Sequence, residues 1–338
     1  MEKRCFFFYF IFVCVLAGSC QLLDSDDKEA KKAAILNNPS LAGITDSLSR
    51  FPDDAGLHLR RGELLSQQNQ HDLAYADYKK AWELKPDETN AIAYTSNLFI
   101  TGKVEEAISI LRHCASEFPE NTEFARRLSE TYMQTGQSRK ALEQYDAILK
   151  ADSNNFEAWY EKGILLAGLK DTTGAITALE RAYVLQPLQL FGISLANLYA
   201  ETKDPRVLPL CNELIEKNGM QENVDILFVK GIYFTNIDDR KKALEQFELC
   251  IKHDWKFTEA YIEKGIIFYN QKNFDEALKT FALAAKVSNT YADAYYWMGR
   301  SFESIGKLNE ARDNYERALA LDKQFEEAKL ALKRLKNS

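Results

Sequence analysis

Apolar and small residues recur in a fixed order along residues 258–325, which divide into two consecutive segments of equal length, 258–291 and 292–325. Within each half of a segment the apolar residues lie three and four positions apart, the spacing that places them on one face of an α-helix. Each segment therefore predicts two helices joined by a turn. Because neither helix can bury its apolar face alone, the segments must stack on their neighbours. The positions that the two segments share are an aromatic at the fourth place (Tyr261, Tyr295), glycine at the eighth (Gly265, Gly299), phenylalanine at the eleventh (Phe268, Phe302), alanine at the twentieth (Ala277, Ala311), an aromatic at the twenty-fourth (Phe281, Tyr315) and alanine at the twenty-seventh (Ala284, Ala318).

The same pattern extends toward the N-terminus and predicts eight segments. They span about 55–88, 89–121, 122–155, 156–189, 190–223, 224–257, 258–291 and 292–325. The twentieth place recurs at a constant interval except that the first interval is shorter by one, and its occupants are Ala74, Ala107, Ala141, Ala175, Pro209, Ala243, Ala277 and Ala311. We interpret the small residues at the eighth and twentieth places as points where the two helix backbones of a segment cross closely. Asn273, followed three residues later by Glu276, predicts a capping box at the start of a second helix.

The fifth segment, 190–223, departs from the pattern. Pro209 occupies its twentieth place, and a proline inside a helix costs about 3 kcal/mol or more. We therefore expect the second helix of this segment to start late or to kink. Residues 20–54 predict an acidic tether followed by half a segment that covers the open end, and residues 326–338 predict a charged capping helix.

The pattern resembles the tetratricopeptide repeat, a helix-turn-helix unit with this spacing. The resemblance covers residues 55–325. It implies an all-α solenoid, a right-handed superhelix of about eight repeats with capping helices at the ends. Residues 55–189 then hold repeats 1–4, residues 190–223 a degenerate repeat 5, and residues 224–325 repeats 6–8.

The first twenty residues have the composition of a secretory signal. Lys3 and Arg4 precede an apolar run, and small residues lead to Cys20. The segment resembles a bacterial lipoprotein signal peptide spanning residues 1–19, which implies that Cys20 is lipidated and becomes the membrane anchor. The residue after it is Gln21 rather than aspartate, which by the same resemblance points to the outer membrane. The alternative is an ordinary cleaved signal in which the cysteine is incidental.

Composition and charge give little sign of catalysis or of nucleic-acid binding. The formal net charge is −7, and no cluster of lysine and arginine with interleaved aromatics is present. The four histidines are spread over three segments and none has a partner at ligand spacing, so we expect no metal site and no cofactor. Cys114, Cys211 and Cys250 are most simply small core residues.

The family resemblance implies that partners bind along the concave face made by the first helices. Its second, fifth, ninth, twelfth and thirteenth places would contact the partner. In this chain four ninth places, Ile164, Leu198, Ile232 and Ile266, form an aliphatic ladder that ends at Arg300. The fifth places are partly aromatic, and the second places are mostly acidic. The alternative is that tight winding buries this apolar strip as ordinary core. The candidate groove residues are Tyr160, Ile164, Phe228, Ile232, Ile262, Ile266, Tyr269 and Tyr296.

Some members of the family hold a partner's terminal carboxylate with a basic residue at the fifth place and asparagine at the ninth. Arg126 occupies a fifth place, but Glu130 follows at the ninth, so this mode is not expected here. The sequence thus predicts a non-catalytic scaffold of the bacterial cell envelope that binds a protein or peptide partner. A carrier that holds a small apolar ligand or lipid in the superhelix is the alternative, and an enzyme would need a catalytic arrangement that the sequence does not display.

Overall fold

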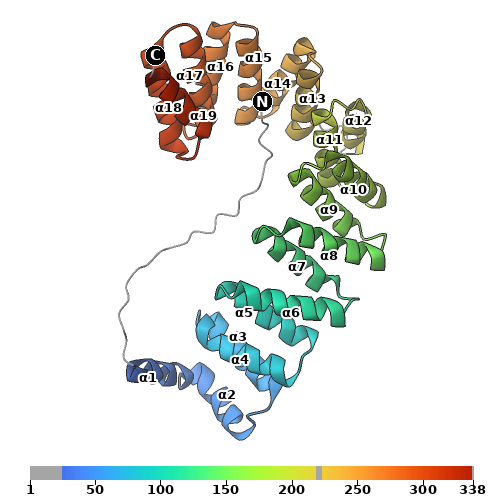
Figure 1. Cartoon of the computed structure of the whole chain (residues 1–338), viewed down its shortest axis with the longest axis vertical. Helices are drawn as coiled ribbons and strands as arrows, with labels where there is room; N and C mark the ends of the chain where they lie inside the picture. The colour runs from blue at the N-terminus through green and yellow to red at the C-terminus, as the bar shows by residue number, and fades with distance from the viewer. Residues whose placement is uncertain (1–24, 218–222, 337–338) are drawn as a thin grey trace. The chain divides into compact units, whose positions relative to one another are not determined.

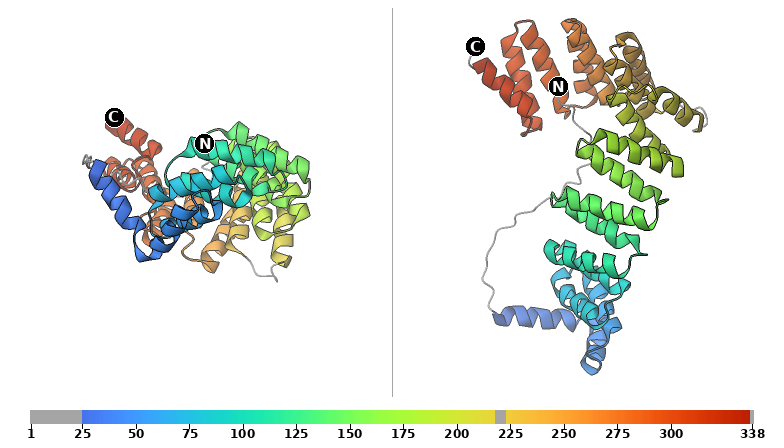
Figure 2. Two further views of the ribbon diagram at one scale, coloured as in Figure 1. Left: turned by 90° about the horizontal axis from the view of Figure 1, so that it is seen from below. Right: turned by 45° about the vertical axis from the view of Figure 1, so that its right-hand side comes forward.

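The computed structural model describes residues 25–217 and 223–336, and these residues form nineteen α-helices and no strand. They divide into two compact units, unit 1 up to Asp171 and unit 2 from Thr172 onward. The all-α fold is therefore confirmed. Within each unit the helices stack in chain order, coloured from blue to green in unit 1 and from green to red in unit 2 (Figure 1). The same stacking within each unit is visible from two further directions (Figure 2).

Unit 1 contains nine of the described helices. They are α1 (Ser25–Leu36), α2 (Pro39–Arg50), α3 (Ala55–Gln67), α4 (His71–Leu84), α5 (Glu88–Ile100), α6 (Val104–Glu117), α7 (Thr122–Gln134), α8 (Ser138–Ala151) and α9 (Phe156–Gly168).

Unit 2 contains the other ten. They are α10 (Thr172–Leu185), α11 (Gln189–Glu201), α12 (Val207–Lys217), α13 (Val224–Asn236), α14 (Arg240–His253), α15 (Thr258–Asn270), α16 (Phe274–Val287), α17 (Ala292–Ser304), α18 (Leu308–Leu321) and α19 (Glu326–Lys336).

The helix lengths repeat with the sequence period. From α3 to α18, the first helix of each pair, here called the A helix, has 13 residues. The second, the B helix, has 14 residues in every pair except the fifth. Each turn from A helix to B helix places one residue in the left-handed region, with φ between 57° and 80°. These residues are Asn69, Gly102, Gly136, Lys170, Lys203, Asp238, Lys272 and Gly306.

The turn after α15 shows how this residue closes the A helix. The backbone N–H of Lys272 donates to the carbonyl oxygen of Tyr269 at 2.9 Å, and that of Asn273 donates to Phe268 at 3.0 Å. These two hydrogen bonds pair carbonyl oxygens that the end of the helix would otherwise leave without a donor. The Asn273 side chain then accepts from the N–H of Glu276 at 3.4 Å. Only this half of the predicted capping box forms: the N–H of Asn273 already donates to Phe268, and the Glu276 carboxylate binds Lys279.

The glycine of the eighth place has a different role from the one expected. A Cβ built on Gly265 would lie 2.4 Å from a ring carbon of Phe281, the aromatic of the twenty-fourth place on the partner B helix. Gly231 meets Phe247 in the same way, also at 2.4 Å. The prediction that the glycine serves contact between backbones is therefore wrong in its reason. The glycine makes room for an aromatic ring, which the B helix inserts against the A helix.

Alanines at the twentieth place lie at the centre of the pairs. Ala74, Ala107, Ala141, Ala243 and Ala277 are all 0% exposed. A larger side chain at this place would have to displace its neighbours, since protein interiors are packed as densely as organic crystals.

The N-terminal end differs from the expected half segment. Residues 25–36 and 39–50 form two helices, α1 and α2, so a complete helix pair precedes α3. Residues 25–27, which the sequence assigns to an acidic tether, belong to the first turn of α1. Asn38 caps α2 by accepting from the N–H of Ser40 at 3.2 Å.

The fifth pair has the late start that its proline predicts. Helix α12 has 11 residues, and Val207 comes four residues after Lys203, the left-handed residue of its turn. In the seventh pair Phe274 follows Lys272 by only two residues. The shift places Pro209 in the first turn of α12, where a helix has no N–H bond to lose and a proline is tolerated.

Two further features bear on function. Cys114, Cys211 and Cys250 are buried at 0% exposure, as predicted for small core residues. Among the helices of residues 25–217 and 223–336, none has both the length and the apolar character needed to cross a membrane.

Candidate partner-binding surface

In unit 2 the A helices α13, α15 and α17 follow one another, and each contacts the next. Their ninth places carry Ile232, Ile266 and Arg300, all of them half-buried. We call these three residues the ninth-place row. A half-buried aliphatic side chain keeps part of its apolar surface in water, and that part is available to a partner.

Two of the three fifth places on the same helices are more deeply packed. Ile262 is 6% exposed and Tyr296 is 9% exposed, and both belong to core clusters of unit 2. The ring of Phe228 lies 5.3 Å from that of Phe257 and 5.6 Å from that of Phe247. Both alternatives raised by the sequence are thus realised on one face. Ile262 and Tyr296 belong to the core, while Phe228 and the ninth places retain partial exposure.

Tyr269, at the twelfth place of α15, links two A helices. Its hydroxyl accepts a hydrogen bond from Nη2 of Arg300 at 3.2 Å and lies 3.0 Å from the hydroxyl of Ser304. Nη1 of Arg300 donates to the hydroxyl of Tyr296 at 3.1 Å. The sequence marked Arg300 only as the end of the aliphatic ladder and missed this cluster. The signal for it was the presence of one tyrosine a turn before the arginine on α17 and another at the twelfth place of the preceding A helix.

The remaining candidates belong to unit 1. Tyr160 and Ile164 lie one turn apart on α9, and both are half-buried. Their neighbourhood in unit 1 differs from the face in unit 2, because the preceding A helix, α7, carries charged residues at the fifth and ninth places. The apolar strip that the sequence predicts from Tyr160 onward therefore does not extend back to α7.

The charges on α7 neutralise one another. Arg126 binds Glu123 at 2.8 Å and also pairs with Glu130. The hydrogen bond from Arg126, supplemented by one from Arg127, lowers the pKa of Glu123. Arg126 is therefore engaged within its own helix, consistent with the expectation that it does not act as a carboxylate grip.

Two of the acidic second places, Glu123 and Glu157, lie beside a shallow hollow of about 420 Å³ in unit 1. Glu123 and Glu157 line it together with Glu88, Glu120, Asn121, Thr122 and Arg126. The Asn121 amide donates to Glu88 at 2.6 Å, so part of this polar surface is already satisfied.

Glu161, on the same helix as Tyr160, is a carboxylate of unit 1 that its surroundings perturb. Its burial raises its pKa, and the nearby Glu130 carboxylate adds to the effect. A perturbed carboxylate can mark a catalytic site when a partner group stands beside it. In the described residues no group of three or more histidine, cysteine, aspartate or glutamate side chains is arranged to hold a metal ion.

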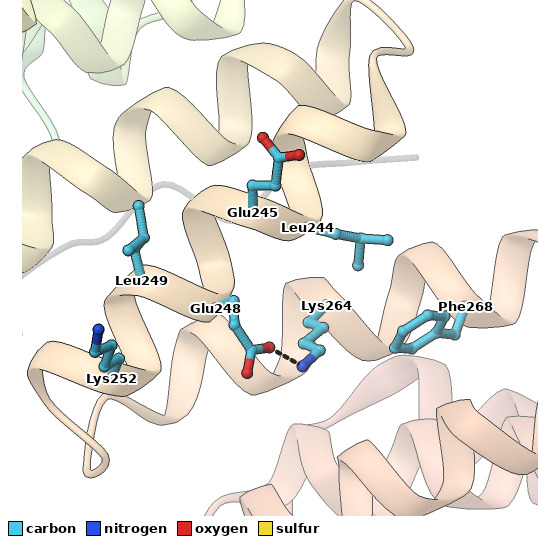
Figure 3. Close-up of a pocket in the computed structure, with 7 residues that line it drawn as sticks. All are labelled: Leu244, Glu245, Glu248, Leu249, Lys252, Lys264 and Phe268. Carbon is cyan, nitrogen blue, oxygen red and sulfur yellow. Dashed lines mark hydrogen bonds and ion pairs between the residues drawn. The ribbon is translucent and has the colours of Figure 1, made fainter.

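A second hollow, of about 600 Å³, lies between α14 and α15 in unit 2 (Figure 3). Its lining consists of Leu244, Glu245, Glu248, Leu249, Lys252, Lys264 and Phe268. Lys264 and Glu248 form an ion pair within it. Lys264 and Phe268 each come two residues after a candidate groove residue of α15, which corresponds to roughly 200° of rotation about the helix. The hollow therefore lies on the opposite side of α15 from the ninth-place row.

Parts of the chain match models of a known protein family and two curated proteins. Residues 55–88, 98–162 and 292–325 each match a model of the tetratricopeptide repeat. The chain is 28% identical over 246 residues to a TPR repeat-containing protein of Treponema pallidum (strain Nichols), a match that covers 62% of this chain and 30% of that protein. It is 23% identical over 223 residues to the BBSome complex member BBS4 of Bos taurus, covering 55% of this chain and 39% of that protein. The matches thus span only about a third of the length of these curated relatives.

Two solved structures share the fold. A tetratricopeptide repeat protein from Parabacteroides merdae ATCC 43184 superposes with a TM-score of 0.51 at 15% identity, covering 84% of this chain and 99% of that one. PilW, described as a type IV pilus biogenesis factor, gives a TM-score of 0.51 at 16% identity, covering 62% of this chain and 98% of that one. At these identities the likeness concerns the fold alone. Together with the repeating helix pairs, the three family matches identify tetratricopeptide repeats within this chain, at residues 55–88, 98–162 and 292–325.

Proposed function

We propose that this protein is a non-catalytic scaffold that binds a peptide or an extended segment of a partner protein on the A-helix face of unit 2. The observation that carries the proposal is the ninth-place row, in which Ile232 and Ile266 stay partly exposed on neighbouring A helices while the fifth place Ile262 beside them is packed in the core. A packed layer beneath a partly exposed layer gives a rigid apolar surface, which needs little reordering when a partner binds.

The energetics require a partner that contacts several side chains at once. Full burial of one large aliphatic side chain contributes about 1.5–3 kcal/mol. Binding at micromolar affinity corresponds to about 8 kcal/mol. Because Ile232 and Ile266 are already half-buried, they supply only part of that energy. An extended segment that also covers Tyr269 and the polar groups around it is the kind of partner that fits.

We further propose that the protein works in a bacterial cell envelope, anchored to the outer membrane through a lipid on Cys20. Cys20 lies outside the described residues, so the support is the sequence alone. The apolar run that ends in Ala17, Gly18, Ser19 and Cys20 supports lipidation, and Gln21 supports the outer membrane over the inner one.

A carrier of a small apolar ligand would need an enclosed apolar cavity. The hollow between α14 and α15 opens broadly to solvent, and an ion pair crosses it (Figure 3). It does not supply such an enclosure. The scaffold is therefore the function that the geometry supports better.

Site-specific crosslinking in intact cells tests the proposal. A photoreactive amino acid is placed at Ile232 or Ile266, and at Leu283 as a control, since Leu283 is a 51% exposed leucine on the B helix α16. We expect the same partner protein to be crosslinked from positions 232 and 266 and not from position 283. Equal crosslinking from all three positions, or crosslinking from 283 alone, would contradict the proposed face.

A double variant separates binding from folding. Ile232→Asp combined with Ile266→Asp should leave the helical circular dichroism unchanged and abolish recovery of the crosslinked partner. If the double variant folds and still captures that partner, the ninth-place row is not the binding surface.

A further inference from the structure

The ninth-place row changes chemistry at its C-terminal end. Ile232 on α13 and Ile266 on α15 are aliphatic, but the equivalent place on α17 holds Arg300. Arginine at a place that is otherwise apolar needs a local environment that compensates its burial, because an unpaired charge in a poorly hydrated site is costly.

Aromatic rings provide that environment. The guanidinium carbon of Arg300 lies 5.3 Å from the ring centroid of Tyr269, 5.5 Å from that of Trp297 and 6.0 Å from that of Tyr296. These distances suit cation–π attraction. The rings also support one another, since Trp297 is 5.5 Å from Tyr269 and 5.6 Å from Tyr296, edge to face in both cases. The side chain of Arg300 is thereby held in one place before any partner arrives.

The hydrogen bonds of Arg300 go to uncharged groups. Both of its acceptors are tyrosine hydroxyls, on Tyr269 and Tyr296. A guanidinium has five N–H donors, so three remain for another acceptor. In the part of the chain that the structure describes, no carboxylate forms an ion pair with Arg300.

The nearest carboxylate along α17 is committed elsewhere. Glu303 accepts from Nε and Nη2 of Arg334 at 2.9 and 2.7 Å, and from the hydroxyl of Tyr315 at 2.6 Å. Arg334 belongs to the capping helix α19, so this pairing fixes α19 on α17. The hydrogen bond from Arg334 lowers the pKa of Glu303, and the nearby charge of Arg300 contributes to the same shift.

From this arrangement we infer that Arg300, held by Tyr269, Tyr296 and Trp297, is a recognition site for a carboxylate on the bound partner segment. The inference rests on the proposed function, because it assigns the chemistry of one end of the same surface. A carboxylate matches the guanidinium in charge and in its planar, two-pronged geometry, and such a pair forms stronger hydrogen bonds than neutral groups do.

The charge of the rest of the chain makes this site selective. The net charge is −7, and the second places of α13, α15 and α17 hold Asp225, Glu259 and Asp293. An acidic group on the partner is repelled at those places and attracted at Arg300. The partner segment is therefore held in one register, with its apolar side chains over Ile232 and Ile266 and its carboxylate at α17.

Selection of peptides by the full chain tests the inference. Two libraries of short random peptides are used, one displayed internally so that only aspartate and glutamate side chains offer a carboxylate, and one displayed with a free C-terminus. Each is selected against the wild type, Arg300→Gln, Arg300→Lys and Arg317→Gln. Arg317 is the matched control, because its guanidinium lies 4.6 Å from the ring of Tyr295 in the same repeat. Circular dichroism and thermal unfolding establish that each variant folds.

We expect the wild type and Arg317→Gln to enrich peptides with a carboxylate at one position, and Arg300→Gln to lose that enrichment. The affinity of a selected peptide should fall about tenfold or more in Arg300→Gln, with a smaller loss in Arg300→Lys, which keeps the charge without the fork. Enrichment in the internal library identifies an acidic side chain as the source, and enrichment confined to the other library identifies a terminal carboxylate.

The remaining outcomes distinguish the carboxylate site at Arg300 from the proposed peptide-binding function. If peptides are selected that require Ile232 and Ile266 but show no acidic preference, or a preference that Arg300→Gln retains, the carboxylate site is refuted and the apolar surface stands. If the folded wild type selects no peptide from either library, both the carboxylate site and the proposed peptide-binding function are refuted.

Discussion

Gly265 and Phe281 form a complementary pair across a helix-turn-helix unit. The ring of Phe281 occupies the space that the side chain of any other residue at position 265 would need, since a Cβ there would lie 2.4, 2.7 and 2.8 Å from three ring carbons. The ring itself is 0% exposed. Three other pairs repeat the arrangement, namely Gly62 with Tyr78, Gly231 with Phe247 and Gly299 with Tyr315.

Gly265→Ala should therefore destabilise the protein, although alanine is the better helix former. Overpacking of this kind costs about 1–3 kcal/mol. The measurement is the urea midpoint, together with amide exchange in α15 and α16. The control is Gly43→Ala in α2, where a Cβ meets nothing within 4 Å. That variant should gain about 0.5–1 kcal/mol from helix propensity. If both substitutions stabilise, the ring at position 281 does not restrict position 265.

Lys272→Gly should stabilise the turn between α15 and α16. Lys272 has φ of 60°, and a residue with a Cβ pays about 1–2 kcal/mol for the left-handed region, whereas glycine does not. The reverse change is available in the next repeat, where Gly306 has φ of 80° and open space around its Cβ. Gly306→Ala should lose a comparable amount. Opposite shifts in the thermal midpoint are the expected result, and shifts of the same sign would contradict it.

Glu161→Gln should raise the stability of the protein at neutral pH. Burial, aided by Glu130, raises the pKa of Glu161 above its ordinary value. The folded state then binds this proton more tightly than the unfolded state does, so stability falls as pH rises through the raised pKa. Glutamine cannot ionise and avoids this loss. The advantage should disappear at a pH below the ordinary glutamate pKa, which urea unfolding at acidic and neutral pH would measure.

Glu123→Gln should show the opposite sign. The hydrogen bond from Arg126 lowers the pKa of Glu123, so its contribution to stability is present at neutral pH and is lost as pH falls through the lowered pKa. The variant should be less stable than the wild type at neutral pH, by up to about 1 kcal/mol for a pair at the surface. The difference should vanish in acid. If Glu161→Gln and Glu123→Gln showed the same pH dependence of stability, the opposite pKa shifts of the two carboxylates would be contradicted.

The three core cysteines should not react with thiol reagents in the folded protein. Burial raises the pKa of Cys114 to about 11 and those of Cys211 and Cys250 to about 12. The thiolate is the reactive form, and all three side chains are 0% exposed. Mass spectrometry after maleimide treatment at mildly alkaline pH should find no label at these positions until urea is added. Prompt labelling of Cys211 alone would indicate that the fifth pair opens locally.

Replacement of Cys20 with serine should release the protein from membranes. The expectation follows from the lipoprotein-like signal, and detergent partitioning with mass analysis of the N-terminal peptide measures it. If Cys20→Ser remains membrane-bound and the wild type carries no acyl mass, the proposed anchor is refuted.

The fold could be predicted from the sequence because many positions recur with the same spacing along the chain. The alanines of the twentieth place and the small residues of the eighth gave the helix pairs, and Pro209 gave the late start of α12. What the sequence did not provide were relations between side chains on different helices. The contact of Gly265 with Phe281 and the hydrogen bond of Arg300 to Tyr269 each depend on how two helices are rotated about their axes, and a periodic pattern does not specify that rotation. Helix α1 was missed because the residues that form it do not repeat.

The constant lengths of the A and B helices have an evolutionary consequence. Removal of residues 258–291 would join Phe257 to Ala292 and leave every later residue at its former place in the repeat. A gene that encodes such a chain can lose or gain a repeat by recombination without disturbing the glycine–aromatic pairs. The junction would, however, bring Met298 to the place of Lys264, and Glu248 would lose its ion-pair partner. A change in repeat number thus alters the surface residues where two repeats meet, while the packing of the interior stays the same. The surface of such a protein can therefore diverge faster than its core.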